Sequence, residues 1–274
     1  MSAAHHTLID FAALRPEMLL VDVSFDLADP AAGERAYAAG HLPGAHYLHL
    51  DRDLSGAKTG PDGRFRGRHP LPERDALAAR LRALGLRRGQ QVVAYDAQGG
   101  MYAARLWWLL RWLGHAEVAV LDGGKQGPLG SELPTVQPGD FEAGAPLVAT
   151  LGADALQARL GQLRLIDARA PERFRGEVEP LDAKAGHIPG ALNRLFKLNL
   201  AADGRFKPAA ELRAEFDALL GLATPAEVVH QCGSGVTACH NLLAMEHAGL
   251  GGALLYPGSW SEWSSDPLRP VAIG

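Results

Sequence analysis

The chain has 274 residues, of which 47% are hydrophobic and 21% are charged, and its formal net charge is −4. This length suits two domains of about 130 residues each, and the composition is that of a soluble globular protein. The small negative charge gives no electrostatic case for a nucleic-acid partner. No apolar run approaches the ~20 residues of a membrane helix, and the N-terminus lacks a secretory signal, so we also expect no membrane partner.

Apolar runs alternate with helical patterns along the first half of the chain. Strands are predicted at 19–23, 92–96 and 118–122, and helices at 73–86 and 102–114. The segment 125–146 is rich in Gly and Pro and has no periodicity, so we interpret it as the end of a first domain plus a linker.

The second half repeats this alternation of strand and helix. Strands are predicted at 163–167, 227–231 and 253–257, and helices at 209–222 and 236–250. Alternation of this kind predicts an α/β fold in which each half forms a mostly parallel sheet covered by helices on both faces.

The two halves also resemble each other in their motifs. GHLPGA at 40–45 corresponds to GHIPGA at 186–191, and VVAYDAQGG at 92–100 corresponds to VVHQCGSGV at 228–236. Motifs repeated in one order, at so long a period, indicate two similar domains and not a solenoid. The predicted division is an N-terminal domain over 1–130, a linker over 131–150 and a C-terminal domain over 151–274.

The chain has two cysteines, Cys232 and Cys239. They are separated by about 10 Å of predicted helical rise, which is too far for an easy disulfide. Two unpaired thiols suit a reducing cytoplasm, where we expect the protein to be located. Two cysteines also cannot make a zinc site from paired Cys motifs, and we predict no metal and no cofactor.

Cys232 follows a predicted strand, at the edge of a parallel sheet where ligands collect. Gly233 and Gly235 permit a turn whose backbone N–H groups face inward, and the next helix adds partial positive charge at its N-terminus. Such surroundings stabilise a thiolate, so we predict a reactive Cys232 and a core position for Cys239. Ala238 stands where a C-x5-R phosphatase needs arginine, which argues against that class.

At this point the sequence resembles the rhodanese family of sulfurtransferases in its tandem-domain form. The resemblance is carried by the paired GH[LI]PGA motifs, by the loop CGSGVT at 232–237 and by YPGSWSEW at 256–263. It implies two rhodanese-like domains, of which the second is catalytic. Asp96 stands where the second half has Cys232, so the first domain would be catalytically silent. The loop is similar to that of the family members that act on 3-mercaptopyruvate.

The resemblance implies that Cys232 accepts the sulfur atom and carries it as a persulfide. The thiolate and the persulfide would be stabilised by the backbone N–H groups of Gly233, Ser234, Gly235, Val236 and Thr237. Ser234 would also join His69 and Asp51 in a proton relay. The Ser234 hydroxyl could instead cap the following helix, and His69 could be a surface histidine.

Arg173 matches a family arginine that binds the anionic end of the donor, and its planar guanidinium suits a carboxylate. Arg175 could substitute for it. The family members acting on 3-mercaptopyruvate usually carry a second arginine where this chain has Leu181. Lys184 lies near that position and could supply a point charge.

We therefore predict a sulfurtransferase that takes sulfur from 3-mercaptopyruvate and delivers it to a thiol, thioredoxin or cyanide. Leu181 leaves thiosulfate open as an alternative donor. A non-catalytic binding or sulfur-relay module is the alternative of another class. We expect a monomer, because the two domains can pair within one chain.

Overall fold

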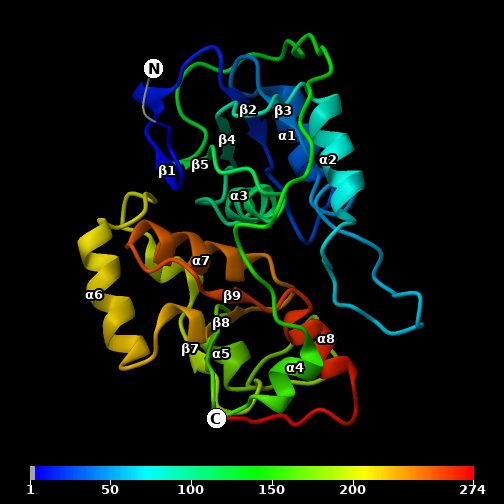
Figure 1. Cartoon of the computed structure of the whole chain (residues 1–274), viewed down its shortest axis with the longest axis vertical. Helices are drawn as coiled ribbons and strands as arrows, with labels where there is room; N and C mark the ends of the chain where they lie inside the picture. The colour runs from blue at the N-terminus through cyan, green and yellow to red at the C-terminus, as the bar shows by residue number, and fades with distance from the viewer. Residues whose placement is uncertain (1–3) are drawn as a thin grey trace. The chain divides into compact units, whose positions relative to one another are not determined.

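The structure is a computed structural model that describes residues 4–274. It divides into two compact units (Figure 1). Unit 1 contains the chain up to residue 56, residues 72–147 and residues 202–206; unit 2 contains residues 57–71, 148–201 and 207–274. A short segment from within the first repeat, 57–71, therefore packs as part of the second unit.

Unit 1 is built on a five-stranded sheet in which all neighbouring strands are parallel. Its strands, in spatial order, are β1 (Leu8–Ile9), β5 (Val118–Leu121), β4 (Val92–Tyr95), β2 (Leu19–Asp22) and β3 (His46–Tyr47). All four side chains of β4 are buried, which requires cover on both faces of the sheet.

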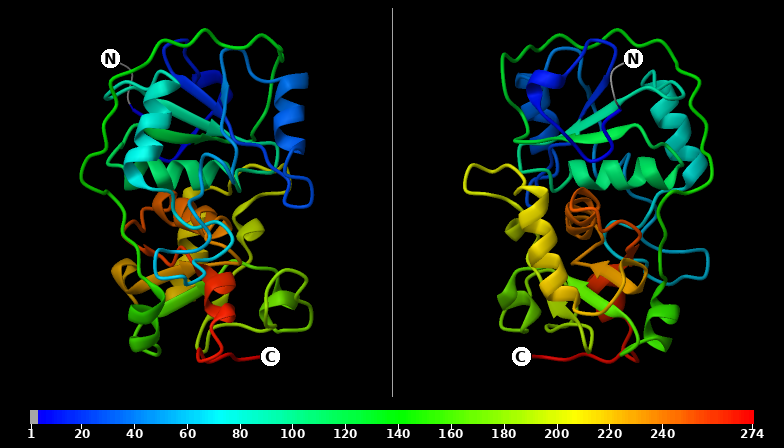
Figure 2. Two further views of the ribbon diagram at one scale, coloured as in Figure 1. Left: turned by 90° about the vertical axis from the view of Figure 1, so that its right-hand side faces the viewer. Right: turned by 60° about the vertical axis from the view of Figure 1, so that its left-hand side comes forward.

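Helices flank this sheet (Figures 1 and 2). They are α1 (Ala32–Ala39), α2 (Arg74–Ala83) and α3 (Ala103–Trp112), with a short 3-10 helix η1 (Phe11–Ala13). The helix α3 packs on β4 and β5, and it buries Trp107 and Trp108 almost completely. Burial of these two large aromatic side chains removes much apolar surface from water and so stabilises α3 in its place.

Unit 2 is built on a four-stranded sheet, again parallel throughout. In spatial order its strands are β7 (Leu192–Asn193), β6 (Arg164–Asp167), β8 (Val228–Gln231) and β9 (Leu254–Leu255). Its helices are α4 (Ala153–Ala158), α5 (Pro171–Phe174), α6 (Ala209–Leu220), α7 (Thr237–His247) and α8 (Ser259–Ser265), with the 3-10 helices η2 (Phe196–Asn199) and η3 (Pro225–Glu227).

Helices cover the two faces of this second sheet (Figures 1 and 2). The helix α7 packs on β8 and α6. Leu165 and Val229 belong to a buried cluster that includes Trp260 and Trp263 from α8. Successive side chains of a strand point to opposite faces, and all four residues of β8 are buried. The predicted α/β fold, with two parallel sheets flanked by helices, is confirmed.

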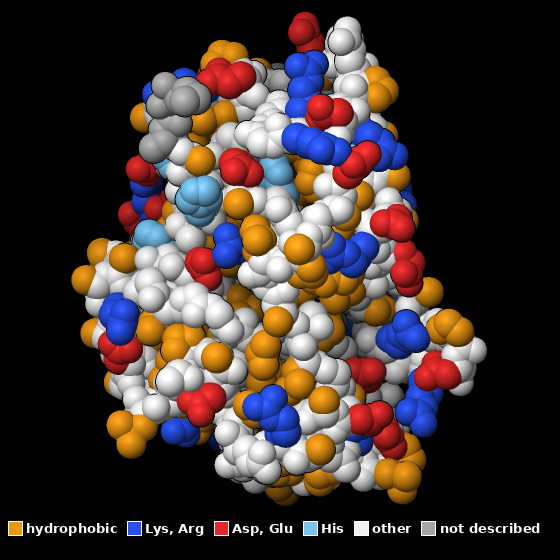
Figure 3. Space-filling model, viewed as in Figure 1, with side chains coloured by type: hydrophobic (Ala, Val, Ile, Leu, Met, Phe, Trp, Pro, Cys, Tyr) orange, Lys and Arg blue, Asp and Glu red, His pale blue; other side chains and the backbone are white. Residues whose placement is uncertain are grey.

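The predicted elements agree with the observed ones to within three residues at most ends. Each long predicted helix ends earlier than its apolar pattern, as at α7, which ends at His247 before Gly249 with φ +74°. Among residues 4–274, no helix is long and apolar enough to cross a membrane. On the face drawn in Figure 3, basic and acidic side chains are interspersed and do not gather by sign.

Candidate active site

Cys232 lies directly after β8, at the carboxyl end of a strand in the middle of the unit 2 sheet. Its side chain is buried, and the N–H of Gly235 donates to its Sγ at 3.1 Å. Gly235 has φ +76°, and a Cβ at this position would come within 2.4 Å of the Pro257 carbonyl oxygen. The turn over the thiol therefore requires glycine at position 235.

The first turn of α8 binds the carbonyl groups of this loop. The Trp260 N–H donates to the Cys232 carbonyl at 3.0 Å, and the Ser261 N–H donates to the Gly233 carbonyl at 2.9 Å. In a trans peptide a carbonyl and the following N–H point in opposite directions. The N–H groups of Gly233 and Ser234 thus point away from α8. We call the amides of residues 233–235 the amide cup.

Ser259 at the start of α8 holds the backbone on the other side of the cysteine. Its Oγ accepts the Cys232 N–H at 3.1 Å and donates to the Tyr256 carbonyl at 2.9 Å. Its φ is +54°, and it is the one non-glycine residue with positive φ in residues 4–274. Such strain costs on the order of 1–3 kcal/mol and is commonly kept where a functional group must be held in place.

Ser234 and His69 meet beside the cysteine loop. The Ser234 Oγ and the His69 Nδ1 lie 2.7 Å apart, and both side chains are buried. His69 comes from the 57–71 segment that packs into unit 2. A hydroxyl and an imidazole at this distance can pass a proton between them.

A cluster of buried charges flanks the loop at Gly233. Arg173, at the end of α5, donates to Glu179 at 2.6 Å and to Asp182 at 3.2 Å. Arg68, next to His69, pairs with the other oxygen of Asp182. The Nε groups of both arginines are buried and have no hydrogen-bond partner among residues 4–274. Two guanidinium groups thus share one carboxylate, and the Nε donor of each is left for another acceptor.

The carboxyl of Asp182 is the titrating group at the centre of this cluster. Burial raises its pKa above the ordinary value, and the neighbouring Arg68 and Arg173 act in the opposite direction. Its side chain is 3% exposed. A carboxyl buried this deeply depends on both arginines to remain ionised.

Other predicted site residues lie in different surroundings. Val236 caps α7 and Thr237 begins it, so both belong to the loop as predicted. Arg175 is exposed, and its guanidinium is paired with Glu177 at 2.7 Å. The Lys184 ammonium donates to the Asp266 carbonyl at 3.0 Å. Each of these two cations has a partner of its own, and their substituting roles stay predictions.

Asp51 lies in unit 1, where it is half-buried and its N–H donates to the His49 Nδ1 at 3.1 Å. Its part in a proton relay stays a prediction. Cys239 lies in α7, fully buried, and its thiol donates to the Gly235 carbonyl at 3.3 Å. This is the core position that the sequence predicts for Cys239, directly beneath the turn.

The corresponding loop of unit 1 is filled by its own side chain. The Asp96 carboxylate accepts four backbone N–H groups, from Gln98 and Gly100 on Oδ1 and from Tyr102 and Ala103 on Oδ2, each at 2.8 Å. Burial raises the pKa of Asp96, and the four amides act against this effect. Here the anion site of the loop is already occupied.

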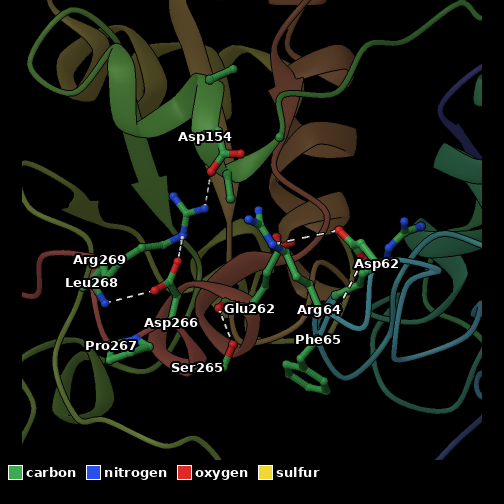
Figure 4. A pocket seen from close by; sticks show the side chains of 14 residues that line it. Asp62, Arg64, Phe65, Asp154, Glu262, Ser265, Asp266, Pro267, Leu268 and Arg269 are labelled. Carbon is green, nitrogen blue, oxygen red and sulfur yellow. Dashed lines mark hydrogen bonds and ion pairs between the residues drawn. The ribbon is translucent and has the colours of Figure 1, made fainter.

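Figure 4 shows a separate pocket of about 780 Å³ in unit 2. Its lining includes neither Cys232 nor Ser234. Arg269 crosses it to Asp154 and Asp266, so that charge is already paired within the wall. The cysteine loop, with its buried thiol, the amide cup and the Ser234–His69 pair, remains the better candidate for an active site.

Sequence reasoning missed Arg68, Glu179 and Asp182. Arg68 carries a signal, because it directly precedes His69 in the segment already assigned to the relay. The two acids carry none, because carboxylates on a loop are ordinarily exposed and solvated.

Comparisons with known proteins were made on the whole chain. The family model described as the rhodanese-like domain matches twice, at residues 10–127 and 152–266. A protein of Pseudomonas aeruginosa named "Probable 3-mercaptopyruvate sulfurtransferase" is 49% identical over 94% of this chain and 93% of its own. The thiosulfate sulfurtransferase of Cricetulus griseus is 34% identical over 92% of this chain and 86% of its own.

A solved structure gives the same result for the fold. The 3-mercaptopyruvate sulfurtransferase from Leishmania major has 30% sequence identity and a TM-score of 0.81. The match covers 94% of this chain and 74% of that chain.

Proposed function

The chain belongs to the rhodanese family, and from this premise we propose that it is a sulfurtransferase. In this proposal the donor is 3-mercaptopyruvate, the sulfur is carried as a persulfide on Cys232, and the acceptor is a thiol, thioredoxin or cyanide. The relatives named above are sulfurtransferases for 3-mercaptopyruvate and for thiosulfate, which supports the class of reaction.

One observation carries the proposal. A buried cysteine lies at the carboxyl end of a central strand. An amide donates to its sulfur, and a hydroxyl of the same loop pairs with the His69 imidazole from the 57–71 segment. The amide donor stabilises negative charge on sulfur, as a thiolate before the reaction and as a persulfide after it. The pair supplies a proton where the leaving group needs one.

In the first half-reaction the Cys232 thiolate attacks the sulfur of 3-mercaptopyruvate. A sulfur–sulfur bond forms, the carbon–sulfur bond breaks, and the electron pair of that bond leaves with carbon as the enolate of pyruvate. The enolate takes up one proton to become pyruvate. The enzyme keeps Cys–S–SH, which loses its proton to the persulfide anion facing the amide cup.

In the second half-reaction an acceptor thiolate attacks the outer sulfur. The new bond is to the acceptor, the sulfur–sulfur bond of the persulfide breaks, and its electrons return to Cys232 as the thiolate. With cyanide the product is thiocyanate. After the two half-reactions Cys232 has returned to its starting oxidation state. No external oxidant or reductant is therefore required.

The proton for the enolate is assigned to the Ser234 hydroxyl, which His69 recharges across their 2.7 Å contact. Asp51 would orient the imidazole in the relay that the sequence predicts. The contribution of such a general acid is on the order of 10²–10⁴-fold in rate.

Thiosulfate is the second candidate donor, favoured by the residue at position 181. Leu181 is exposed and brings no charge to the site. Thiosulfate releases sulfite when the thiolate takes its outer sulfur, and sulfite leaves as a stable anion that needs no proton. The two donors therefore differ in their need for His69.

The test is the effect of His69→Ala on kcat/KM for the two donors. We expect a loss of about 10²-fold with 3-mercaptopyruvate and a much smaller loss with thiosulfate. His6→Ala, which removes an exposed histidine of unit 1, is the control and should change neither value. Full activity of His69→Ala with 3-mercaptopyruvate would refute the relay, and absence of transfer from both donors in the wild-type protein would refute the function.

We also propose a cellular location and an oligomeric state for the protein. Within residues 4–274 both cysteines are buried and neither forms a disulfide, which suits a reducing cytoplasm. A monomer is proposed as the working form, because each unit has its own core and the site residues named here come from one chain.

A further inference from the structure

We infer that Arg68 is a donor-binding residue, which together with Arg173 holds the anionic end of the sulfur donor. The inference rests on the proposed function, since it names the residue that recognises the substrate of that reaction. Arg68 lies beside the cysteine loop, on the segment 57–71. This segment packs as part of unit 2 but belongs to the first repeat in the sequence.

The backbone of this segment is fixed against α8 by two close contacts. A Cβ on Gly67 would come within 2.7 Å of the Gly258 carbonyl oxygen, and the φ of Gly67 is +101°. The Arg68 N–H donates to the Ser261 Oγ at 3.0 Å. Ser261 in turn donates its N–H to the Gly233 carbonyl. The arginine is thus tied to the same helix turn that holds the amide cup.

The Arg68 guanidinium then reaches the loop itself. A Cβ built on Gly233 would lie 2.7 Å from the Arg68 Nη2 and 3.6 Å from the Arg173 Nη1. Two cations therefore approach the residue next to the nucleophile, and the missing side chain of Gly233 leaves room for both. Two guanidinium groups converging on one point form a fork for a planar anion.

Both arginines have donors that the protein does not use. The Nε groups of Arg68 and Arg173 are buried without a partner in the described chain. A buried donor with no acceptor is costly, and an anion bound beside Gly233 would offer an acceptor to both groups. Asp182 takes one nitrogen from each arginine and leaves both Nε groups over.

The cluster balances its own charge, so a bound anion would depend on the unused Nε donors and not on excess positive charge. Arg68, Arg169 and Arg173 face three acids, Asp167, Glu179 and Asp182, through direct ion pairs. Asp182 bridges two of these arginines, as a donor carboxylate would. We therefore assign to the donor a carboxylate or sulfonate group that shares Arg68 and Arg173 with Asp182, a few bonds away from the sulfur that Cys232 attacks.

The first experiment compares Arg68→Gln with Arg64→Gln, which removes an exposed arginine of the same segment. We expect KM for 3-mercaptopyruvate to rise 10- to 100-fold in Arg68→Gln, with kcat within about threefold, and no change in Arg64→Gln. Arg68→Lys should fall between, because it keeps the charge without the fork. A parallel rise in KM for thiosulfate would mean that the arginines bind either anion. A rise in KM for 3-mercaptopyruvate alone would mean that they recognise its carboxylate. Unchanged KM values for both donors would overturn the inference.

A double variant separates donor binding from simple neutralisation of Asp182. If Arg68 only neutralises that acid, Asp182→Asn combined with Arg68→Gln should restore the wild-type KM. If Arg68 binds the donor, the double variant stays impaired while Asp182→Asn alone keeps or lowers KM. Restoration by the double variant contradicts the inference.

A measurement of pyruvate binding tests the anion site independently of sulfur transfer. Pyruvate carries the carboxylate but no transferable sulfur, and calorimetry measures its Kd without turnover. We expect Kd to rise about 10-fold or more in Arg68→Gln and not in Arg64→Gln. If the wild-type protein transfers no sulfur, the function fails while this result still supports the anion site. Equal Kd values in the two variants would overturn the anion site even in an active enzyme, and Arg68→Lys serves as the test variant if Arg68→Gln does not fold.

Discussion

The two loops that follow β4 and β8 occupy corresponding places in the two sheets and hold different groups. After β4, Asp96 places its carboxylate among four amides of its own loop. After β8, the Cys232 sulfur receives one amide, from Gly235. The first loop has six residues before its helix, 97–102, and the second has four, 233–236.

This difference shows how one loop architecture can hold an internal carboxylate in one unit and, in the function proposed above, a reactive thiol in the other. A carboxylate brings its own negative charge, satisfies the amides permanently and closes the site. The Cys232 thiol accepts the Gly235 amide, and in the function proposed above the amide cup stabilises the anion that forms on this sulfur. The two loops also differ two residues further along the chain. Gln98 follows Asp96 at the position where Ser234 follows Cys232.

The largest expected effect concerns the group that fills the second loop. Cys232→Ser should lower sulfur transfer by at least about 10³-fold, because a hydroxyl cannot carry a persulfide. The measurement is kcat/KM with 3-mercaptopyruvate and with thiosulfate. Cys239→Ser is the matched control, since that thiol lies buried beneath the turn and should be dispensable. Activity that survives in Cys232→Ser and falls in Cys239→Ser would reverse the roles of the two thiols.

The next effect concerns the group that fills the first loop. Asp96→Ala leaves four amides without an acceptor, and we expect the free energy of unfolding of unit 1 to fall by about 3 kcal/mol. Hydrogen exchange of the Tyr102 and Ala103 amides would localise the loss. Asp26→Ala, which removes an exposed acid accepting one amide, should cost about 1 kcal/mol or less. An equal cost for the two variants would contradict the account of the closed loop.

The smallest effect concerns the strands that lead into the loops. His230 in β8 stands where β4 has Ala94, and burial first, then Arg194, lowers the pKa of His230 to about 3. An unfolded chain binds this proton near pH 6.5, whereas the native protein does not until about pH 3. The stability contributed by the neutral imidazole is therefore present above pH 6.5 and is lost as the pH falls, by up to about 1.4 kcal/mol per pH unit.

His230→Gln should reduce the slope of unfolding free energy against pH between 6.5 and 3, while the exposed His6→Gln should keep the wild-type slope. Chemical denaturation at several pH values measures both. The comparison uses slopes, because His230 also packs against Met245 and the substitution changes stability at every pH. Identical slopes in the three proteins would show that β8 carries no titrating group that β4 lacks.

Much of this comparison could be predicted from the sequence, because it depends on local patterns. The alternation of apolar runs and helices gives the parallel sheets, and the alignment of Asp96 with Cys232 gives the two loops. The pairing of Ser234 with His69 was reached through family resemblance, since 165 residues separate the two side chains in the chain. Periodicity and spacing hold no information on such a long-range contact.

The buried ion cluster is the part that sequence reasoning could not reach. Arg68, Glu179 and Asp182 are ordinary charged loop residues until the fold brings them together and excludes water from them. Conversely, Arg175 and Lys184 look suitable from their place near Arg173, but one pairs with Glu177 and the other with a backbone carbonyl. Packing within unit 2 determines which arginine faces the loop. The close approach of Gly67 to Gly258 is one of the contacts that bring Arg68 there.

Peptide mass spectrometry after treatment with 3-mercaptopyruvate, in the absence of an acceptor, would show directly whether Cys232 carries the transferred sulfur. We expect one added sulfur atom, about 32 Da, on Cys232 and none on Cys239, and we expect the adduct to be lost when an acceptor thiol is added. Both thiols can lie in one peptide, so fragmentation must separate positions 232 and 239. A wild-type protein that remains unmodified by 3-mercaptopyruvate and by thiosulfate, or that carries the adduct on Cys239, would contradict the account.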